Sequence, residues 1–196
     1  MPTRKELLHG IRAELIEAAE LKVLLAGQAG SQLLAGVHVW ERALNSGGKI
    51  LFCGNGGSAA DCQHAATELV VRLKKNRRAF AALALTTDTS LLTACANDLG
   101  FEKVFQRQVE ALGNAGDVLV ALSTSGRSAN ILAAARQARK QKLKVMALTG
   151  PAASPLAKLA DCVLAVPSTD TQRIQEAHIL FLHILCRQAE RLLLRR

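Results

Sequence analysis

Aromatic residues are scarce in this chain of 196 residues, which has no Tyr, one Trp and five Phe. The scarcity matters because the chain is basic, with a formal net charge of +9. Its basic residues gather at Arg72–Arg78, Arg136–Lys144 and Arg195–Arg196, and the first two clusters fall near predicted C-terminal ends of helices. Proteins that hold single-stranded nucleic acid usually interleave basic and aromatic side chains, since stacking supplies about 1–3 kcal/mol per base. We therefore favour solvated helix ends over a nucleic-acid surface, with attraction of small anions as a third interpretation.

Long hydrophobic runs are also missing. The longest uninterrupted ones have about seven residues, such as Ala79–Leu85, whereas a membrane-spanning helix needs roughly 20. The N-terminal segment carries acidic residues at helical spacing and no apolar core followed by a small-residue cleavage site. It therefore does not resemble a signal peptide, and we expect no membrane association.

No Cys-x-x-Cys pair occurs among the five cysteines, which are Cys53, Cys62, Cys95, Cys162 and Cys186. An odd number without such pairs argues against a disulfide framework or a cysteine metal site. A chain of this length can bury a sufficient core without cross-links. We expect free, buried thiols in a reducing compartment and hence a cytoplasmic location.

Strand and helix patterns alternate along the middle of the chain. Five short apolar runs are typical of buried parallel strands: Lys49–Cys53, Ala81–Leu85, Asp117–Leu122, Lys144–Leu148 and Cys162–Val166. The longer segments between them have helical periodicity, as at Ser58–Leu73, Phe101–Leu112 and Ser128–Lys140. The alternation predicts an α/β fold, a three-layer αβα sandwich with a five-stranded, mainly parallel sheet of the flavodoxin-like or Rossmann-like type.

Further helices are predicted at both ends of this core. Residues 5–26 and 31–46 repeat apolar side chains every three or four positions, which is the period of an amphipathic helix. A last helix is predicted from about Thr171 to Leu194. No linker or repeat interrupts the pattern, so we expect one domain over residues 1–196, with N-terminal helices in residues 1–47 and the α/β core in residues 48–196.

Ligands of open parallel sheets bind where strands end and helices begin. The first such loop, Cys53–Ala60, is rich in glycine. Gly56 and Gly57 allow a close approach of the backbone to a ligand, and Ser58 is expected to cap the following helix. The loop follows neither the Walker A nor the G-x-G-x-x-G pattern, so no nucleotide is indicated.

A second loop holds four hydroxyl groups at the start of a helix, on Ser123, Thr124, Ser125 and Ser128. Hydroxyls combined with free N–H groups at a helix N-terminus bind phosphate monoesters. An ordinary capped turn is the alternative interpretation. Two further polar segments, Thr86–Ser90 and Asn97–Asp98, are expected in loops and are weak signals by themselves.

Two predicted helices carry candidate catalytic groups. His64 and Glu68 are four residues apart and hence on one helical face, about 6 Å from each other. That spacing suits metal chelation or an oriented base, with an exposed surface pair as the alternative. The last helix places Gln175, His178 and His183 within an apolar segment. A buried histidine that satisfies a backbone partner is the usual explanation of such residues.

Taken in order along the chain, these motifs resemble the sugar isomerase (SIS) domain family, and within it the isomerases that act on sedoheptulose 7-phosphate. The resemblance runs from about Gly48 to Cys186. It rests on Cys53–Asp61, Gln63–Glu68, Leu85–Ser90, Asn97–Asp98, Leu112–Leu119, Ser123–Ser128, Ala147–Gly150 and Arg173–His183. It implies a homotetramer with sites where subunits meet and N-terminal helices used in packing. The implied reaction yields D-glycero-D-manno-heptose 7-phosphate, the first step of bacterial heptose synthesis for lipopolysaccharide.

The resemblance also assigns roles to single residues. Hydroxyl groups of Ser123, Thr124, Ser125 and Ser128 would hold the phosphate, and the sugar would contact Asn55, Gly56, Gly57, Asn97, Asp98 and Gln175. Glu68 would be the general base that moves a proton between the first two carbons through a cis-enediol. His183 would be the general acid. One zinc ion per subunit would be bound by His64, Glu68, Gln175 and His183, and no nucleotide cofactor is implied.

Simple geometry constrains this ligand set. A helix rises about 1.5 Å per residue, so Gln175 and His183 start about 12 Å apart along the axis, and His178 is the geometric rival of Gln175. A carboxylate bound to zinc loses basicity, so Glu68 needs a shift in coordination to act as a base. Zinc would polarise the substrate carbonyl, or His183 would serve it as an acid.

Two other functions share these loops. One belongs to proteins of the same fold that bind a bacterial replication initiator; that branch lacks an acidic residue at the Glu68 position and a histidine at the His183 position, and this chain has both. The other is a sugar-phosphate sensor without turnover, which the sequence leaves open. The chain also reads Asn76–Ala79 where family members commonly have Arg-Pro, a change expected to alter loop shape more than chemistry.

Overall fold

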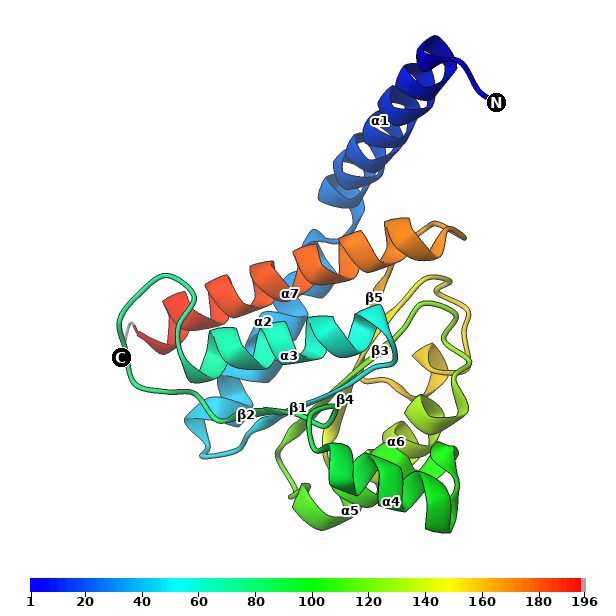
Figure 1. Ribbon diagram of the computed structural model, residues 1–196. Helices are drawn as coiled ribbons and strands as arrows, with labels where there is room; N and C mark the ends of the chain where they lie inside the picture. The colour runs from blue at the N-terminus through cyan, green and yellow to red at the C-terminus, as the bar shows by residue number, and fades with distance from the viewer. Residues whose placement is uncertain (195–196) are drawn as a thin grey trace.

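The computed structural model describes residues 1–194 and arranges them as one sheet with helices on both faces (Figure 1). The strands are β1 (Ile50–Cys53), β2 (Ala82–Ala84), β3 (Val118–Ser123), β4 (Lys144–Thr149) and β5 (Cys162–Ala165). They pair in parallel in the order β2-β1-β3-β4-β5. The predicted fold class and all five predicted strands are confirmed. The basic pair Arg195–Arg196 lies outside the described residues.

The sheet separates two sets of helices. Its faces alternate residue by residue, so that Ile50 and Phe52 of β1 belong to one apolar cluster while Leu51 and Cys53 belong to the other. The first cluster is covered by α2 (Gly30–Asn45), α3 (Gly57–Val70) and α7 (Thr171–Leu193). The second is covered by α4 (Thr89–Leu99), α5 (Val104–Leu112) and α6 (Ala129–Lys140). The helices that carry the candidate catalytic groups, α3 and α7, therefore lie on the same face of the sheet.

The prediction that Asn97 and Asp98 lie in a loop is wrong. Both residues lie at the C-terminal end of α4. Asp88 starts this helix, because its side chain accepts a hydrogen bond from the backbone N–H of Leu91 at 2.9 Å. Leu91 packs against the second apolar cluster, and Gly100, with φ +93°, ends the helix.

The prediction that Ser58 caps α3 is also wrong. The helix begins at Gly57, and Gly56, with φ +55°, occupies the cap position without a side-chain hydrogen bond. Ser58 is buried in the first turn, where the chain passes so close to Gly54 that a Cβ there would lie 2.7 Å from the Ser58 carbonyl oxygen. The glycines of this loop thus allow β1 and α3 to meet at close range.

The first helix, α1 (Arg4–Gln28), points away from the rest of the chain (Figure 1). Its existence was predicted, but its apolar positions do not face the core, since Leu7, Ile11 and Leu15 are all more than half exposed. Leu25 is its one buried residue among those described. Most of the apolar surface of α1 is therefore uncovered in a single chain. No described helix combines the length and the apolar character that a membrane span requires.

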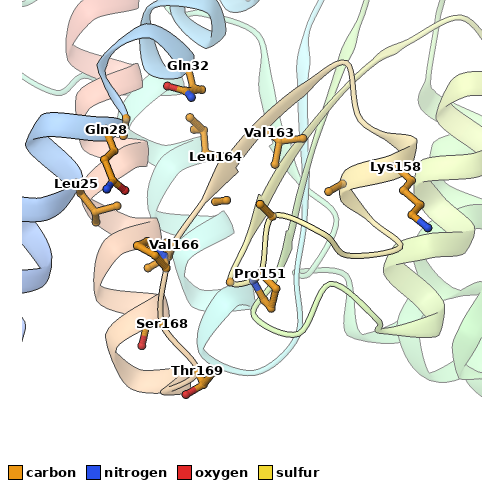
Figure 2. A pocket seen from close by; sticks show the side chains of 16 residues that line it. Leu25, Gln28, Gln32, Pro151, Lys158, Val163, Leu164, Val166, Ser168 and Thr169 are labelled. Carbon is orange, nitrogen blue, oxygen red and sulfur yellow. The ribbon is translucent and has the colours of Figure 1, made fainter.

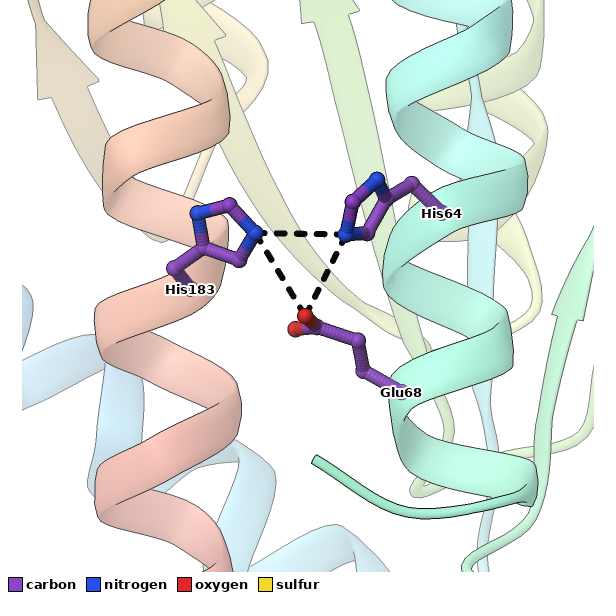
Figure 3. A group of neighbouring side chains, drawn as sticks. All are labelled: His64, Glu68 and His183. Atoms are coloured by element: carbon purple, nitrogen blue, oxygen red, sulfur yellow. Dashed lines mark hydrogen bonds and ion pairs between the residues drawn. The ribbon is translucent and has the colours of Figure 1, made fainter. Parts of the chain in front are cut away.

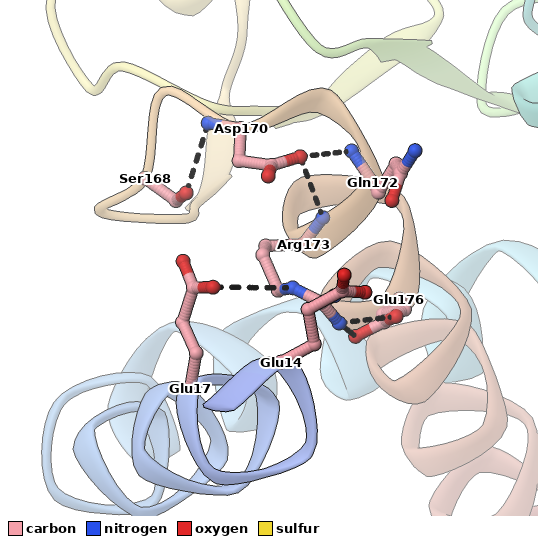
Figure 4. Close-up of polar contacts among 7 residues, drawn as sticks. All are labelled: Glu14, Glu17, Ser168, Asp170, Gln172, Arg173 and Glu176. Carbon is pink, nitrogen blue, oxygen red and sulfur yellow. Dashed lines mark hydrogen bonds and ion pairs between the residues drawn. The ribbon is translucent and has the colours of Figure 1, made fainter. Parts of the chain in front are cut away.

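Arg173 connects α1 to the start of α7 (Figure 4). Its guanidinium group donates to both oxygens of Glu176 at 2.6 and 2.7 Å. It also lies 3.6 Å from a Glu14 oxygen and 3.9 Å from a Glu17 oxygen, both on α1. Because the Glu14 and Glu17 side chains are exposed, these longer pairs are screened by water and orient α1 weakly.

Candidate active site

Helices α3 and α7 lie side by side and run in the same direction (Figure 1). The side chain of Gln175 lies against Gly57 near their N-terminal ends, where a Cβ on Gly57 would meet the amide oxygen at 2.8 Å. Further along, the Cys186 sulfur lies 4.0 Å from the Ala65 carbonyl oxygen. This parallel arrangement brings residues more than 100 positions apart in sequence into contact at several points along the two helices.

His64, Glu68 and His183 form a triangle between the two helices (Figure 3). The Glu68 Oε1 atom lies 3.2 Å from His64 Nε2 and 3.4 Å from His183 Nε2, and the two Nε2 atoms are 3.2 Å apart. The Glu68 side chain is 11% exposed, compared with 52% for His64 and 42% for His183. The carboxylate is thus held beneath two imidazoles that are open to solvent, and the predicted shared face of His64 and Glu68 is confirmed.

The triangle could hold a metal ion. Tetrahedral zinc has bonds of about 2.0–2.1 Å to these donors, so its ligand atoms lie about 3.3 Å apart. The three distances in the triangle, 3.2, 3.2 and 3.4 Å, match that spacing. The second oxygen of Glu68, Oε2, is buried and has no hydrogen-bond partner among the described residues. Donor type and spacing therefore both fit zinc.

His178 does not take part in this triangle. The residue is fully buried, and neither ring nitrogen has a hydrogen-bond partner of good geometry in the described part of the chain. Burial lowers the pKa of His178 to about 4, and a backbone group of Thr149 opposes this shift. His178 is therefore a neutral core residue on the buried side of α7 and not a ligand that competes with Gln175.

Asp61 belongs to the same surface of α3 and was not singled out by the sequence analysis. It precedes His64 by one helical turn, and its buried Oδ2 atom has no hydrogen-bond partner among the described residues. Burial raises the pKa of Asp61, while the nearby His64 and His183 act in the opposite direction. The three-residue spacing from His64 was the signal that could have identified it.

The hydroxyl-rich loop leads from β3 into the start of α6, the position predicted for it. Ser123, at the end of β3, lies 3.1 Å from Ser128 hydroxyl to hydroxyl, and Ser128 occupies the cap position of α6 without capping it by a side-chain bond. Gly126, with φ +63°, turns the loop so tightly against Ser154 that a Cβ there would lie 2.4 Å from its hydroxyl. The Ser125 hydroxyl accepts from the Arg127 N–H at 3.2 Å. The N–H groups of Ala129 and Asn130, the first two of α6, therefore have no partner among the described residues, while that of Ile131 donates to the Asn130 side chain.

Asn55 joins the glycine-rich loop to the hydroxyl-rich loop. Its side-chain amide exchanges two hydrogen bonds with that of Asn130, at 3.0 and 2.8 Å. Asn130 is buried in the first turn of α6, and its oxygen also accepts from the Ile131 N–H. The two loops follow the adjacent strands β1 and β3, so the amide pair sets their relative position. No sequence signal distinguished Asn130 from other polar residues.

Asn97 and Asp98 contact each other rather than the triangle. The Asn97 amide donates to an Asp98 oxygen at 2.8 Å. Asp98 lines a groove of about 450 Å³ between α4 and α5, which also includes Leu91 and Arg107. Their predicted contact with a sugar stays a prediction.

A cavity of about 1090 Å³ lies on another part of the molecule (Figure 2). Its wall is formed by the junction of α1 and α2, the β5 edge strand and the segment after β4, with Leu25, Pro151 and Val166 among its mostly apolar lining. None of the predicted site residues lines it. The imidazoles of the triangle and the Ser125 side chain are exposed in a single chain, and this cavity lies apart from them.

Several known proteins are similar to this chain in sequence. Residues 17–150 match the model of the SIS domain family. The phosphoheptose isomerase of Campylobacter jejuni is 58% identical over 143 residues, or 73% of this chain and 77% of that protein. The phosphoheptose isomerase of Akkermansia muciniphila is 48% identical over 92% of this chain and 95% of its own length.

A solved structure extends the similarity to three dimensions. The phosphoheptose isomerase of Neisseria gonorrhoeae is 43% identical and superimposes with a TM-score of 0.89, over 94% of this chain and 98% of that one. Sequence and fold therefore agree over nearly the whole length. This chain belongs to the SIS domain family and, within it, to the phosphoheptose isomerases.

Proposed function

We propose that this protein converts D-sedoheptulose 7-phosphate to D-glycero-D-manno-heptose 7-phosphate, the first step of bacterial heptose synthesis for lipopolysaccharide. The observation that carries the proposal is the triangle: Glu68, a buried carboxylate, lies 3.2–3.4 Å from the imidazoles of His64 and His183. Such a triangle supplies both a base and an acid at one place. The relatives named phosphoheptose isomerase support this assignment.

The proposed reaction moves one proton between neighbouring carbons. Glu68 takes a proton from C1 of the ketose and returns it to C2, and a cis-enediol is formed in between. His183 donates a proton to the carbonyl oxygen at C2 and accepts one from the hydroxyl at C1, so atoms and charge balance. The low exposure of Glu68 favours this chemistry, because it shields the base from water while the histidines face the substrate.

We propose zinc as the metal of the triangle, with His64, Glu68 and His183 as ligands. When bound, zinc would polarise the substrate carbonyl and stabilise the charge of the enediolate in place of a proton from His183. Glu68 would then have to leave the metal to act as the base. Gln175 stays a predicted fourth ligand; its side chain contacts Gly57 at the start of α3, about 12 Å along the helix axis from the level of His183. From that place Gln175 is better located to contact the sugar.

The remaining predicted residues would bind the substrate. The hydroxyls of Ser123, Thr124, Ser125 and Ser128 would hold the phosphate together with free N–H groups of α6. The glycine-rich loop, with Asn55, Gly56 and Gly57, would lie along the sugar, and Asn97 with Asp98 would contact its hydroxyls. Neutral donors would therefore carry most of the phosphate recognition.

We also propose that the working unit is a homotetramer in the cytoplasm. The uncovered apolar residues of α1, such as Ile11 and Leu15, support a role of residues 1–47 in packing between subunits. The open surface around the triangle supports it as well, because a second chain would close the site. The five cysteines, all free and buried, are in keeping with a reducing compartment.

An isomerase assay tests the proposed activity. The purified protein, with zinc added, is expected to convert sedoheptulose 7-phosphate to the aldose, followed by coupled detection of the product or by NMR of the sugar carbons. Protein that binds the sugar phosphate in calorimetry without turnover would instead be the sensor named above. Conversion of other ketose phosphates at equal rates would contradict the heptose assignment.

Mixed oligomers test which chain supplies each catalytic group. Glu68 and His183 approach to 3.4 Å within one chain, so each site needs both residues from the same subunit. We therefore expect that Glu68→Gln and His183→Gln chains, mixed and reassembled, regain no activity in the isomerase assay. Recovery to about a quarter of the wild-type rate would show that the two residues act across chains.

A further inference from the structure

Arg77 lies in the loop between α3 and β2, and its side chain is buried next to the two helices that carry the triangle. The side chain is 1% exposed, and that of its partner, Glu190 on α7, is 3% exposed. Arg77 Nε donates to Glu190 Oε1 at 3.1 Å. Arg72 and Lys75 of the same loop are exposed. Charged side chains are almost never this deeply buried unless they are paired. A solvated helix end, a nucleic-acid surface and the attraction of small anions all require an exposed side chain, so none of them explains Arg77.

Both Nη atoms of Arg77 donate to the C-terminal end of α3, and Nη1 also donates to the Arg78 carbonyl at 3.0 Å. Nη2 donates to the backbone carbonyl of Glu68 at 2.7 Å, and Nη1 donates to that of Leu69 at 2.8 Å. Carbonyl groups in the last turn of a helix lack partners within the helix, and a positive charge there also suits the helix dipole. The guanidinium carbon stacks 4.1 Å from the centre of the Phe80 ring. Arg77 therefore holds the backbone of the residue whose side chain is the proposed base.

Glu190 extends the same connection to α7. It follows His183 by seven residues, which is two helical turns, so the two side chains lie on one face of α7 about 10 Å apart along its axis. Arg77 thus ties α3 at Glu68 to α7 at Glu190. On α7 this connection lies two turns beyond His183, whose Nε2 atom is 3.4 Å from Glu68 Oε1.

Packing alone does not require charges at this place. Apolar side chains such as Leu69, Leu185 and Ala189 already join the two helices, and a buried ion pair adds little net stability compared with apolar residues of the same volume. Hydrogen bonds are directional, however, and fix how far one helix slides along the other. We propose that Arg77 is a positioning residue that sets where Glu68 lies along the helix axis relative to His183. As a contribution to catalysis, this inference rests on the proposed isomerase function.

Three variants test the inference. The double variant Arg77→Met/Glu190→Met replaces the ion pair with apolar side chains and is expected to keep a melting temperature close to that of the wild type. Its kcat is expected to fall about 10- to 100-fold, with KM changed by less than about threefold, because a displacement of about 1 Å costs catalysis more than binding. Arg77→Lys keeps the charge but cannot bridge Glu190 and two carbonyls together, and its kcat is expected to fall about tenfold. Arg78→Met is the matched control, since the Arg78 guanidinium lies 5.2 Å from the same Phe80 ring but the residue is exposed.

Crystal structures of the two Arg77 variants separate this inference from the proposed function. We expect the distance between Glu68 Oε1 and His183 Nε2 to grow by about 1 Å in either variant and to stay unchanged in Arg78→Met. An unchanged distance, or a kcat within about twofold of wild type in both Arg77 variants, overturns the inference. Should the double variant not fold, Arg77→Lys decides alone. A wild-type protein without isomerase activity overturns the proposed function, while the measured distance still decides whether Arg77 positions Glu68.

Discussion

Glu68→Gln is expected to lower kcat about 10³-fold while the affinity for the sugar phosphate stays within a few fold. Removal of a general base typically costs 10²- to 10⁴-fold, and the amide cannot take a proton from carbon. The substitution keeps the size of the side chain, and the proposed phosphate contacts lie on a different loop, between β3 and α6. The isomerase assay gives kcat, and calorimetry with sedoheptulose 7-phosphate gives the affinity.

A matched control for this variant is Glu110→Gln, which removes an exposed carboxylate from α5 on the opposite face of the sheet. Its kcat and affinity are expected to equal those of the wild type. A Glu68→Gln enzyme with more than about a tenth of wild-type activity would rule out Glu68 as the base. Equal losses of turnover and affinity would point to a role in binding instead.

The free energy of unfolding is expected to fall at acidic pH because His178 is buried in its neutral form. Its pKa is about 4 in the folded state because of burial, compared with about 6.5 in the unfolded chain. The unfolded state therefore takes up a proton first as the pH falls below 6.5, so the contribution of neutral His178 to stability is complete above pH 6.5 and is lost toward pH 4. The loss amounts to about 3 kcal/mol between pH 7.5 and 4.

The variant His178→Gln isolates this contribution, because glutamine has a similar polarity and does not titrate in this range. Free energies of unfolding from urea titrations at pH 7.5, 5.5 and 4, at one protein concentration, are expected to fall less steeply in the variant by about 3 kcal/mol. Parallel pH profiles for variant and wild type would show that His178 is protonated or solvated in the folded state, contrary to its complete burial.

Sequence patterns predicted the sheet and two members of the triangle, His64 and Glu68, for clear physical reasons, whereas His183 was assigned only by the family resemblance. Buried parallel strands need continuous apolar runs, and such runs marked all five strands. His64 and Glu68 were paired because a four-residue spacing fixes a shared helical face. The helix α4 was missed because polar residues near its ends, such as Thr89 and Asp98, are typical of loops. Its apolar face packs against the second cluster, and that tertiary contact is not visible in the sequence.

Contacts between distant segments could not be predicted in the same way. The residues next to Asn130 and Glu190 in sequence give no sign of a special role. Their importance follows from the hydrogen bonds that they form with Asn55 and Arg77 in the folded chain. The loop that contains Arg77 was expected to affect shape more than chemistry, yet its guanidinium group bonds to the Glu68 carbonyl. Side chains that act across 75 or 113 positions leave no periodic signal.

Two buried thiols, Cys62 on α3 and Cys186 on α7, belong to the apolar cluster beneath these helices, and the Cys186 sulfur lies against the α3 backbone, 4.0 Å from the Ala65 carbonyl oxygen. Burial raises the pKa of both well above that of a free cysteine, and only the thiolate reacts quickly with alkylating reagents. Because Cys186 is packed against α3, it reacts when α7 moves away from α3, so the rate at which Cys186 is alkylated measures how often the helix pair that holds the triangle opens.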